Sequence, residues 1–130
     1  MSREERVYAD PSMNMENEEY WKATKQGKLI LKKCDDCGET HFFPRIICPH
    51  CQSSNTSWYE ASGKGRIYSY SVVRRAPIPY AIAYVTLDEG VSMLTNLVDC
   101  DFDDLAVDKE VEVTFRDTEG GEKLPMFRPV

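Results

Sequence analysis

Four cysteines in the first half of the chain have the residue type and the spacing of a metal site. Cys34 and Cys37 form one Cys-x-x-Cys pair, and Cys48 and Cys51 form a second pair, which begins after ten intervening residues. Each pair presents two thiolates from one tight turn, and four thiolates complete the tetrahedral shell that Zn²⁺ prefers. A shell filled by protein ligands leaves no position for water or substrate, so the pattern predicts one structural Zn²⁺ per chain.

Two other uses of such cysteines fit less well. Disulfide scaffolds are typical of secreted chains, and we find no signal peptide, whereas a redox Cys-x-x-Cys belongs at the start of a helix and does not come doubled. His41 and His50 are expected beside the metal and not on it, because the cysteines already fill the shell. Reduced zinc-binding thiols, together with a longest apolar run too short for a membrane span, lead us to expect a cytoplasmic protein.

The elements that position the cysteines are short. We expect a loose arm over residues 1–10 and a helix over residues 16–26, with Ser12 or Asn14 as its N-cap and Gly27 as its end. Strands are expected over residues 28–33, 42–47 and 57–60. These three strands would carry the two cysteine turns, as in a rubredoxin-like zinc ribbon.

Beyond residues 62–65, which read as a turn, the sequence alternates short strands with turn signals. Strands are expected over residues 65–74, 80–87, 91–98, 110–115 and 124–128, with one helical turn around Phe102 and Leu105. Five short antiparallel strands predict a Greek-key barrel of the OB-fold type. The predicted fold is therefore mainly β, with an N-terminal arm and helix (1–27), a zinc ribbon (28–61) and an OB-fold barrel (62–130).

The order of several short motifs resembles a prokaryotic family of zinc-ribbon/OB-fold proteins, a domain of unknown function associated with acyl-CoA metabolism. The motifs that carry the resemblance are Gly27-Lys-Leu, the four cysteines, Phe43-Pro-Arg45, Gly63-Lys-Gly65 with Tyr68-Ser-Tyr70, Pro79-Tyr80, Leu87-Asp-Glu-Gly90, Val111-Glu-Val113 and Pro125-Met-Phe127. Two departures stand out. Asp108 occupies a turn position where the family usually has glycine, and the loop of residues 75–80 is short.

The resemblance implies a non-catalytic accessory subunit that lies beside a thiolase-like enzyme or another acyl-CoA enzyme and binds acyl-CoA or shapes its channel. Coenzyme A carries phosphates that need cationic partners. The candidate ligand residues are Arg74 and Arg75 at the end of a strand, and then Lys32, Lys33 and Arg45 in the ribbon. Each of these side chains has a simpler alternative as a solvated surface charge or salt-bridge partner.

Tyr20 and Trp21 are the only large apolar side chains of the predicted helix. They are candidates for contact with a partner protein, and the alternative is that they fasten the helix to the rest of this chain.

The runner-up function is a module that binds single-stranded nucleic acid, since OB folds with exposed tyrosines can stack bases. The net charge of −6 and the acidic C-terminal half speak against it. An enzymatic role has little support, because Cys100 is the only thiol outside the zinc shell and no histidine follows it. The expected ligands and partners are thus Zn²⁺, acyl-CoA or coenzyme A, and an acyl-CoA-processing enzyme.

Overall fold

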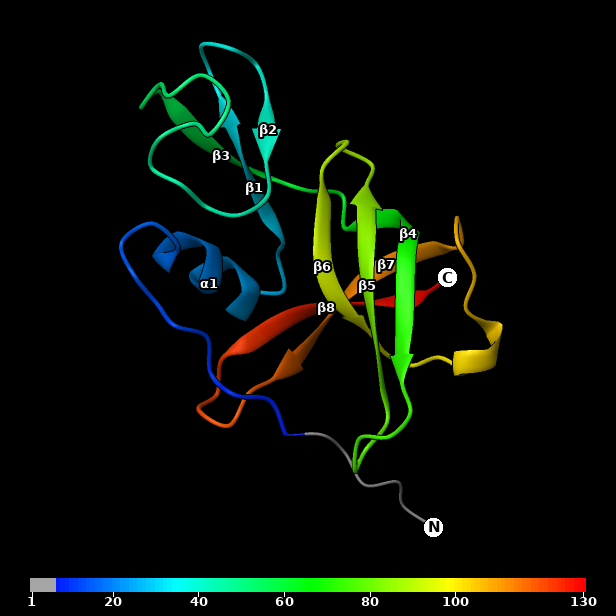
Figure 1. Cartoon of the computed structure of the whole chain (residues 1–130). Helices are drawn as coiled ribbons and strands as arrows, with labels where there is room; N and C mark the ends of the chain where they lie inside the picture. The colour runs from blue at the N-terminus through cyan, green and yellow to red at the C-terminus, as the bar shows by residue number, and fades with distance from the viewer. Residues whose placement is uncertain (1–6) are drawn as a thin grey trace.

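The computed structural model describes residues 7–130. These residues form one short helix and eight strands, and the strands are arranged in two sheets. In chain order the elements are α1 (Glu18–Lys25), β1 (Ile30–Cys34), β2 (Thr40–His41), β3 (Thr56–Glu60), β4 (Lys64–Val73), β5 (Tyr80–Leu87), β6 (Ser92–Leu97), the 3-10 turn η1 (Phe102–Asp104), β7 (Glu110–Asp117) and β8 (Lys123–Pro129). Figure 1 shows the small β1–β3 sheet beside α1 and the larger β4–β8 barrel.

The small sheet has the strand order β2-β1-β3, and both pairings are antiparallel. Only the prediction of a strand over residues 42–47 is wrong here, since β2 ends at His41 and residues 42–47 form an irregular loop. Pro44 lies in the middle of this loop, and a proline has no N–H to donate to a strand ladder. The loop instead carries the chain around to the second cysteine turn.

The large sheet closes into a barrel with the strand order β4-β5-β6-β8-β7. All its pairings are antiparallel except β6 with β8, which gives the topology of an OB fold. The inward side chains of β5 alternate along the strand, as Ala81, Ala83, Val85 and Leu87. Gly65 in β4 is required by close packing, because a Cβ there would lie 2.5 Å from the Thr86 carbonyl oxygen of β5. The predicted mainly β architecture of helix, ribbon and barrel is confirmed.

The turn that leads into β7 contains Asp108, at the position where glycine is usual. Its φ is 69°, in the left-handed region, and aspartate is among the residues that tolerate this region. The Asp108 N–H donates to the Ile67 carbonyl at 2.8 Å, which holds the turn against β4. The glycine is therefore replaced without loss of the turn.

The helix α1 packs between the ribbon and the barrel. Tyr20 is 2% exposed and belongs to one cluster of buried residues that also includes Leu31 of the ribbon and Phe127 of the barrel. Lys25 at the end of α1 forms an ion pair of 3.0 Å with Glu122 in the turn between β7 and β8. The division into residues 1–27, 28–61 and 62–130 stays a prediction, and the buried cluster runs across it. No helix in the described part of the chain is long and apolar enough to span a membrane.

The segment before α1 differs from expectation. Residues 1–6 of the predicted arm lie outside the described residues. Tyr8 and Asp10, however, contact the β7–β8 turn. The Glu119 N–H donates to the Tyr8 carbonyl at 3.0 Å, and the Gly120 N–H donates to the Asp10 carboxylate at 2.9 Å. The Thr118 hydroxyl also donates to this carboxylate and, with the Gly120 bond, lowers the pKa of Asp10. The described part of the predicted loose arm is thus bound to the barrel.

Candidate metal centre and flanking surfaces

Two turns with the same backbone pattern hold the four cysteines. Cys34 ends β1, and its carbonyl accepts a hydrogen bond of 2.9 Å from the Gly38 N–H; the Cys48 carbonyl accepts one of the same length from Gln52. Gly38 has φ 77° and Gln52 has φ 67°, so each Cys-x-x-Cys pair is followed by a residue in the left-handed region. Glycine adopts this conformation at no steric cost, which explains its place after Cys37.

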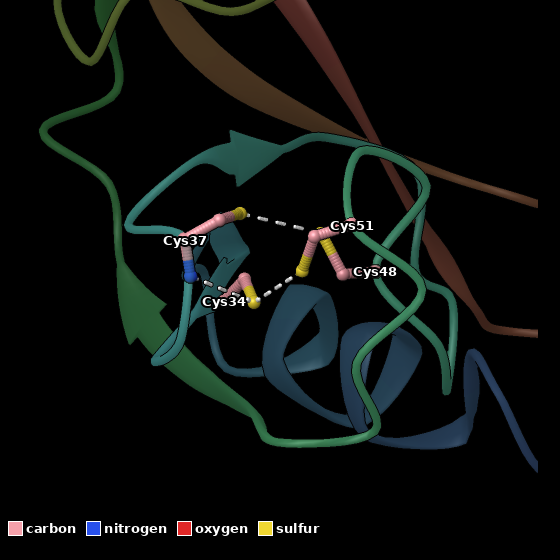
Figure 2. A group of neighbouring side chains, drawn as sticks. All are labelled: Cys34, Cys37, Cys48 and Cys51. Atoms are coloured by element: carbon pink, nitrogen blue, oxygen red, sulfur yellow. Dashed lines mark hydrogen bonds between the residues drawn. The ribbon is translucent and has the colours of Figure 1, made fainter.

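The four sulfur atoms lie within 4.8 Å of one another. The Sγ atoms of Cys34 and Cys51 are 3.4 Å apart, and those of Cys37 and Cys48 are 3.7 Å apart, as the dashed lines in Figure 2 indicate. Sulfurs on one tetrahedral Zn²⁺ at about 2.3 Å each would be about 3.8 Å apart, whereas a disulfide needs about 2.05 Å. The geometry therefore fits one zinc ion with four thiolate ligands and excludes disulfides in this arrangement.

Backbone N–H groups favour the thiolate form that zinc needs. The Cys37 N–H points at the Cys34 sulfur at 3.4 Å, and this bond is the main cause that lowers the pKa of Cys34 to about 7. The His50 N–H lies at the same distance from the Cys48 sulfur. Cys34 and Cys48 are fully buried while Cys37 and Cys51 face solvent. Among the described residues, the metal-ligating cluster consists of cysteines alone, with neither histidine in it.

Hydroxyl side chains bind the two aspartates of the first cysteine turn, one from the second cysteine turn and one from β3. The Ser53 hydroxyl donates to the Asp36 carboxylate, which lowers the pKa of Asp36, and the Ser57 hydroxyl donates to Asp35 at 3.0 Å. Sequence reasoning did not identify these contacts. The only sequence signal for them was the pair of aspartates between the first two cysteines. The serine that binds each aspartate is set by the folded positions of the turns.

The prediction of Lys32 as a phosphate ligand must be corrected. Lys32 is only 9% exposed, and its ammonium group donates to the Arg45 carbonyl and to the Thr56 hydroxyl, both at 3.2 Å. It also lies 4.8 Å from the centre of the Trp58 ring. Its charge is thus used inside the ribbon, where it ties the 42–47 loop to β3.

The other four cations are exposed but lie in two separate places. Lys33 and Arg45 belong to the ribbon, while Arg74 and Arg75 follow β4, at the end of the barrel away from the ribbon (Figure 1). Arg45 lies 4.6 Å from the Phe43 ring and 3.9 Å from the Glu16 carboxylate, and Arg74 pairs with Asp103 at 3.2 Å. The predicted ligand residues therefore do not converge on one site.

Tyr20 does not offer a surface to a partner, so this part of the predicted contact is corrected. Its buried ring packs edge-on against Trp21, with centroids 4.8 Å apart, and against Phe42 at 5.9 Å. Burial also raises the pKa of its hydroxyl. Trp21 is half-buried and lines an apolar pocket between α1, the ribbon loop and β6, a feature that no sequence pattern indicated.

Comparison with known proteins identifies both parts of the chain. Residues 21–57 match the family model "ChsH2, rubredoxin-like zinc ribbon domain", and residues 58–116 match "ChsH2, C-terminal OB-fold domain". With this match the four cysteines are the ligands of one structural Zn²⁺.

Three curated relatives are similar to the chain over most of its length. A DUF35 domain-containing scaffold protein of Methanothermobacter thermautotrophicus is 41% identical over 68% of this chain and 71% of its own. A probable enoyl-CoA hydratase alpha subunit of Thermomonospora curvata is 34% identical over 92% of this chain, which spans only 39% of that relative. The benzoylsuccinyl-CoA thiolase subunit BbsA of Geobacter metallireducens is 28% identical over 81% of this chain and 75% of its own.

A solved structure described as "Ltp2-ChsH2(DUF35) aldolase" has the same fold. Its chain superposes with a TM-score of 0.84 and 34% identity over 92% of this chain and 98% of that one. The ribbon, the barrel and the sequence identity agree along the same residues. This chain belongs to the DUF35 family and is built from a ChsH2-type zinc ribbon and an OB-fold barrel.

Proposed function

We propose that this protein is a non-catalytic accessory subunit that docks on an acyl-CoA-processing enzyme and contributes to holding its acyl-CoA. The observation that carries the proposal is the match over 92% of the chain to a ChsH2 domain whose structure is described as part of an aldolase. Relatives named as a thiolase subunit and a hydratase subunit support the same assignment. Other relatives carry the name of scaffold proteins, which favours a role without chemistry of its own.

The metal centre supports a structural role for the ribbon. Four thiolates fill a tetrahedral zinc shell, and such a shell has no open position at which water or a carbonyl could be activated. The zinc would therefore hold the ribbon in shape and, through α1, keep its loop against the barrel. The chemistry of the assembled enzyme would be that of the partner.

Acyl-CoA binding would rest on exposed cations. Arg75 and Lys33 are exposed, and neither takes part in the salt bridges found among the described residues. The Arg75 guanidinium group and the Lys33 ammonium group are therefore available to phosphates. Because these two groups lie at different ends of the molecule, one chain would contribute a single cation group to any one coenzyme A. The partner enzyme would supply the remaining contacts.

The nucleic-acid alternative is not favoured. An OB fold that binds single strands combines stacking aromatic side chains with cations that follow the backbone. Tyr84 is exposed on β5, but the seven residues that line the pocket beside it are uncharged. The Tyr70 hydroxyl is already used, since it donates to the Leu105 carbonyl at 2.9 Å.

The test is to purify the protein from its native cells under mild conditions and to identify the protein that co-purifies with it. We expect an acyl-CoA enzyme in a fixed stoichiometry. When the two are expressed separately and mixed, turnover of the enzyme's acyl-CoA substrate should rise at least about tenfold over the enzyme alone. A tenfold rise corresponds to about 1.4 kcal/mol of transition-state stabilisation. This chain alone should show no turnover.

A control for the assay is the apo-protein prepared by chelation, which keeps the sequence but lacks the ribbon's metal. An enzyme that is equally active and equally stable with and without the holo-protein would overturn the proposal.

A further inference from the structure

An uncharged surface runs from α1 across β6 to β4. It is formed by two pockets, of about 170 Å³ and 180 Å³, which eleven and seven residues line, with Leu94 common to both. Trp21 and Phe43 lie at one end of this surface, Leu94 in the middle, and Tyr84 and Ser69 at the other end. Five of these seventeen lining residues are buried, Tyr20 among them, and we call the other twelve the β6 face. In Figure 1 its strands β4, β5 and β6 lie side by side, with β6 nearest to α1 and the ribbon.

The register of the strands explains why apolar side chains point outward here. Ser69 pairs with Tyr84, and Tyr84 pairs with Leu94, so the three residues form one row across β4, β5 and β6. Side chains in such a row point to the same side of the sheet. Leu94 is 56% exposed and Tyr84 is 49% exposed. The barrel core lies on the other side of the sheet, so this row has no role in filling it.

The charge of the β6 face is unusual for this protein. None of the seventeen lining residues is Asp, Glu, Lys or Arg. Charged residues make up 29% of the chain, and an ordinary surface of twelve residues would include about three. A site for the phosphates of coenzyme A or of nucleic acid needs cations, which this face lacks. Its complement is an occupant that is itself uncharged and apolar.

The shape of the face favours a polypeptide over a small molecule. Small-molecule sites enclose most of the ligand surface, whereas Leu94 and Tyr84 project from an open sheet with a shallow pocket on each side of Leu94. A standard protein interface uses about 20–30 residues on each side, so the twelve accessible residues of the β6 face would form about half of one side. Aromatic residues, which are enriched in interfaces, lie at both ends of the β6 face, with Trp21 and Phe43 at the α1 end and Tyr84 at the other.

We propose that the β6 face is the surface with which this protein docks on its partner, and that its occupant is an uncharged apolar surface of the acyl-CoA-processing enzyme. This inference rests on the proposed function. Apolar side chains of the enzyme enter the two pockets on either side of Leu94, and the acyl-CoA phosphates lie outside this face. Trp21 contributes through the wall of the α1 pocket and not as a freely exposed anchor.

The test compares two substitutions of equally exposed apolar residues. Leu94→Arg places a charge in the middle of the β6 face, and Val107→Arg places the same charge in the connection between η1 and β7, where the residue is 58% exposed and outside both pockets. Binding to the purified acyl-CoA enzyme that co-purifies with the native protein is measured by calorimetry. Leu94→Arg should raise the Kd at least about 30-fold, while Val107→Arg should change it by less than about threefold.

Tyr84→Ala gives a second variant that adds no charge, and it should raise the Kd about tenfold. Zinc content and thermal unfolding of all variants are measured first, and surface substitutions at these positions should leave both nearly unchanged.

Four outcomes would overturn the inference in distinguishable ways. If the enzyme binds the wild-type protein and the Leu94→Arg variant equally well, the docking surface lies elsewhere and the proposed function stands. If no acyl-CoA enzyme binds the wild-type protein, both fail. If the protein alone sediments as a dimer that Leu94→Arg converts to a monomer, the occupant is a second copy. If Leu94→Arg instead abolishes binding of coenzyme A to the isolated protein, the face is a small-molecule site.

Discussion

Neighbouring residues of one type have opposite roles in β1. Lys32 points into the ribbon and is held by the Arg45 carbonyl and the Trp58 ring, whereas Lys33 is exposed. Successive side chains of a strand point to opposite faces, so a basic pair on a strand provides one surface cation and not two. Arg74 and Arg75 lie in the turn after β4 and are both exposed, but Arg74 is paired with Asp103.

At this scale the proposed acyl-CoA contact gives a prediction. Arg75→Glu should raise the KM of the assembled enzyme for acyl-CoA about tenfold with little change in kcat, because it removes a charged contact to phosphate that is present in both ground state and transition state. Steady-state kinetics of the reconstituted complex measure this. Lys64→Glu, which reverses an exposed charge at the opposite end of β4, is the matched control. Equal KM values for both variants would remove Arg75 from the proposed site.

Among the elements, α1 is the one whose role the structure changes most. Its amphipathic face carries Tyr20 into the core shared by ribbon and barrel, and Lys25 pairs with Glu122 of the β7–β8 turn. The segment before it is fastened to the same turn through Asp10. The helix is therefore part of the framework that sets the position of the ribbon beside β6. Tyr20 and Trp21 both line the surface pocket, and of the two only Trp21 is partly exposed.

Truncation of the buried ring tests this role of the helix. Tyr20→Ala should lower the free energy of unfolding by about 3 kcal/mol, since it leaves a cavity between two parts of the chain. Thermal unfolding should shift down by about 10 °C. Lys22→Ala on the exposed side of α1 should change stability by less than about 0.5 kcal/mol. A Tyr20→Ala protein of unchanged stability that has lost its partner would restore the helix to the role of a docking element.

In the whole molecule, ribbon and barrel are joined by a continuous core but are stabilised differently. Leu29 and Leu31 of the ribbon belong to the same buried cluster as Val85 and Phe127 of the barrel. The barrel closes all its strands on one another, whereas the ribbon has one five-residue pair, a two-residue strand and long turns. A unit of this size without its metal has too little buried apolar surface to stay folded.

Zinc removal should therefore unfold one part of the protein before the other. After chelation, or in the Cys34→Ser variant, amides of β1–β3 and α1 should exchange quickly while those of β4–β8 stay protected, as measured by hydrogen exchange with mass spectrometry. The midpoint of thermal unfolding should fall, because the ribbon's share of the common core is lost. Cys100→Ser, which changes a thiol outside the cluster, should retain one zinc per chain. Full protection of the ribbon without metal would contradict this account.

The sequence by itself determined the metal centre and the order of the elements. Two Cys-x-x-Cys turns bring their own ligands together, because each turn is local and its geometry depends on four or five residues. The barrel strands could be predicted for the same reason, since alternation of apolar residues in β5 and turn residues on either side are local signals. The strand predicted over residues 42–47 is absent, because Pro44 has no N–H for a strand ladder and the apolar composition of the segment does not compensate for this.

Only the tertiary structure decided which side chains are accessible. Burial of Tyr20 and Lys32, attachment of Asp10 to the β7–β8 turn, and the separation of Lys33 from Arg75 depend on how ribbon, helix and barrel pack, and no local pattern contains that information. The β6 face is the clearest case. Ser69, Tyr84 and Leu94 are far apart in sequence and unremarkable one by one, and they become a single uncharged surface because strand register places them in one row.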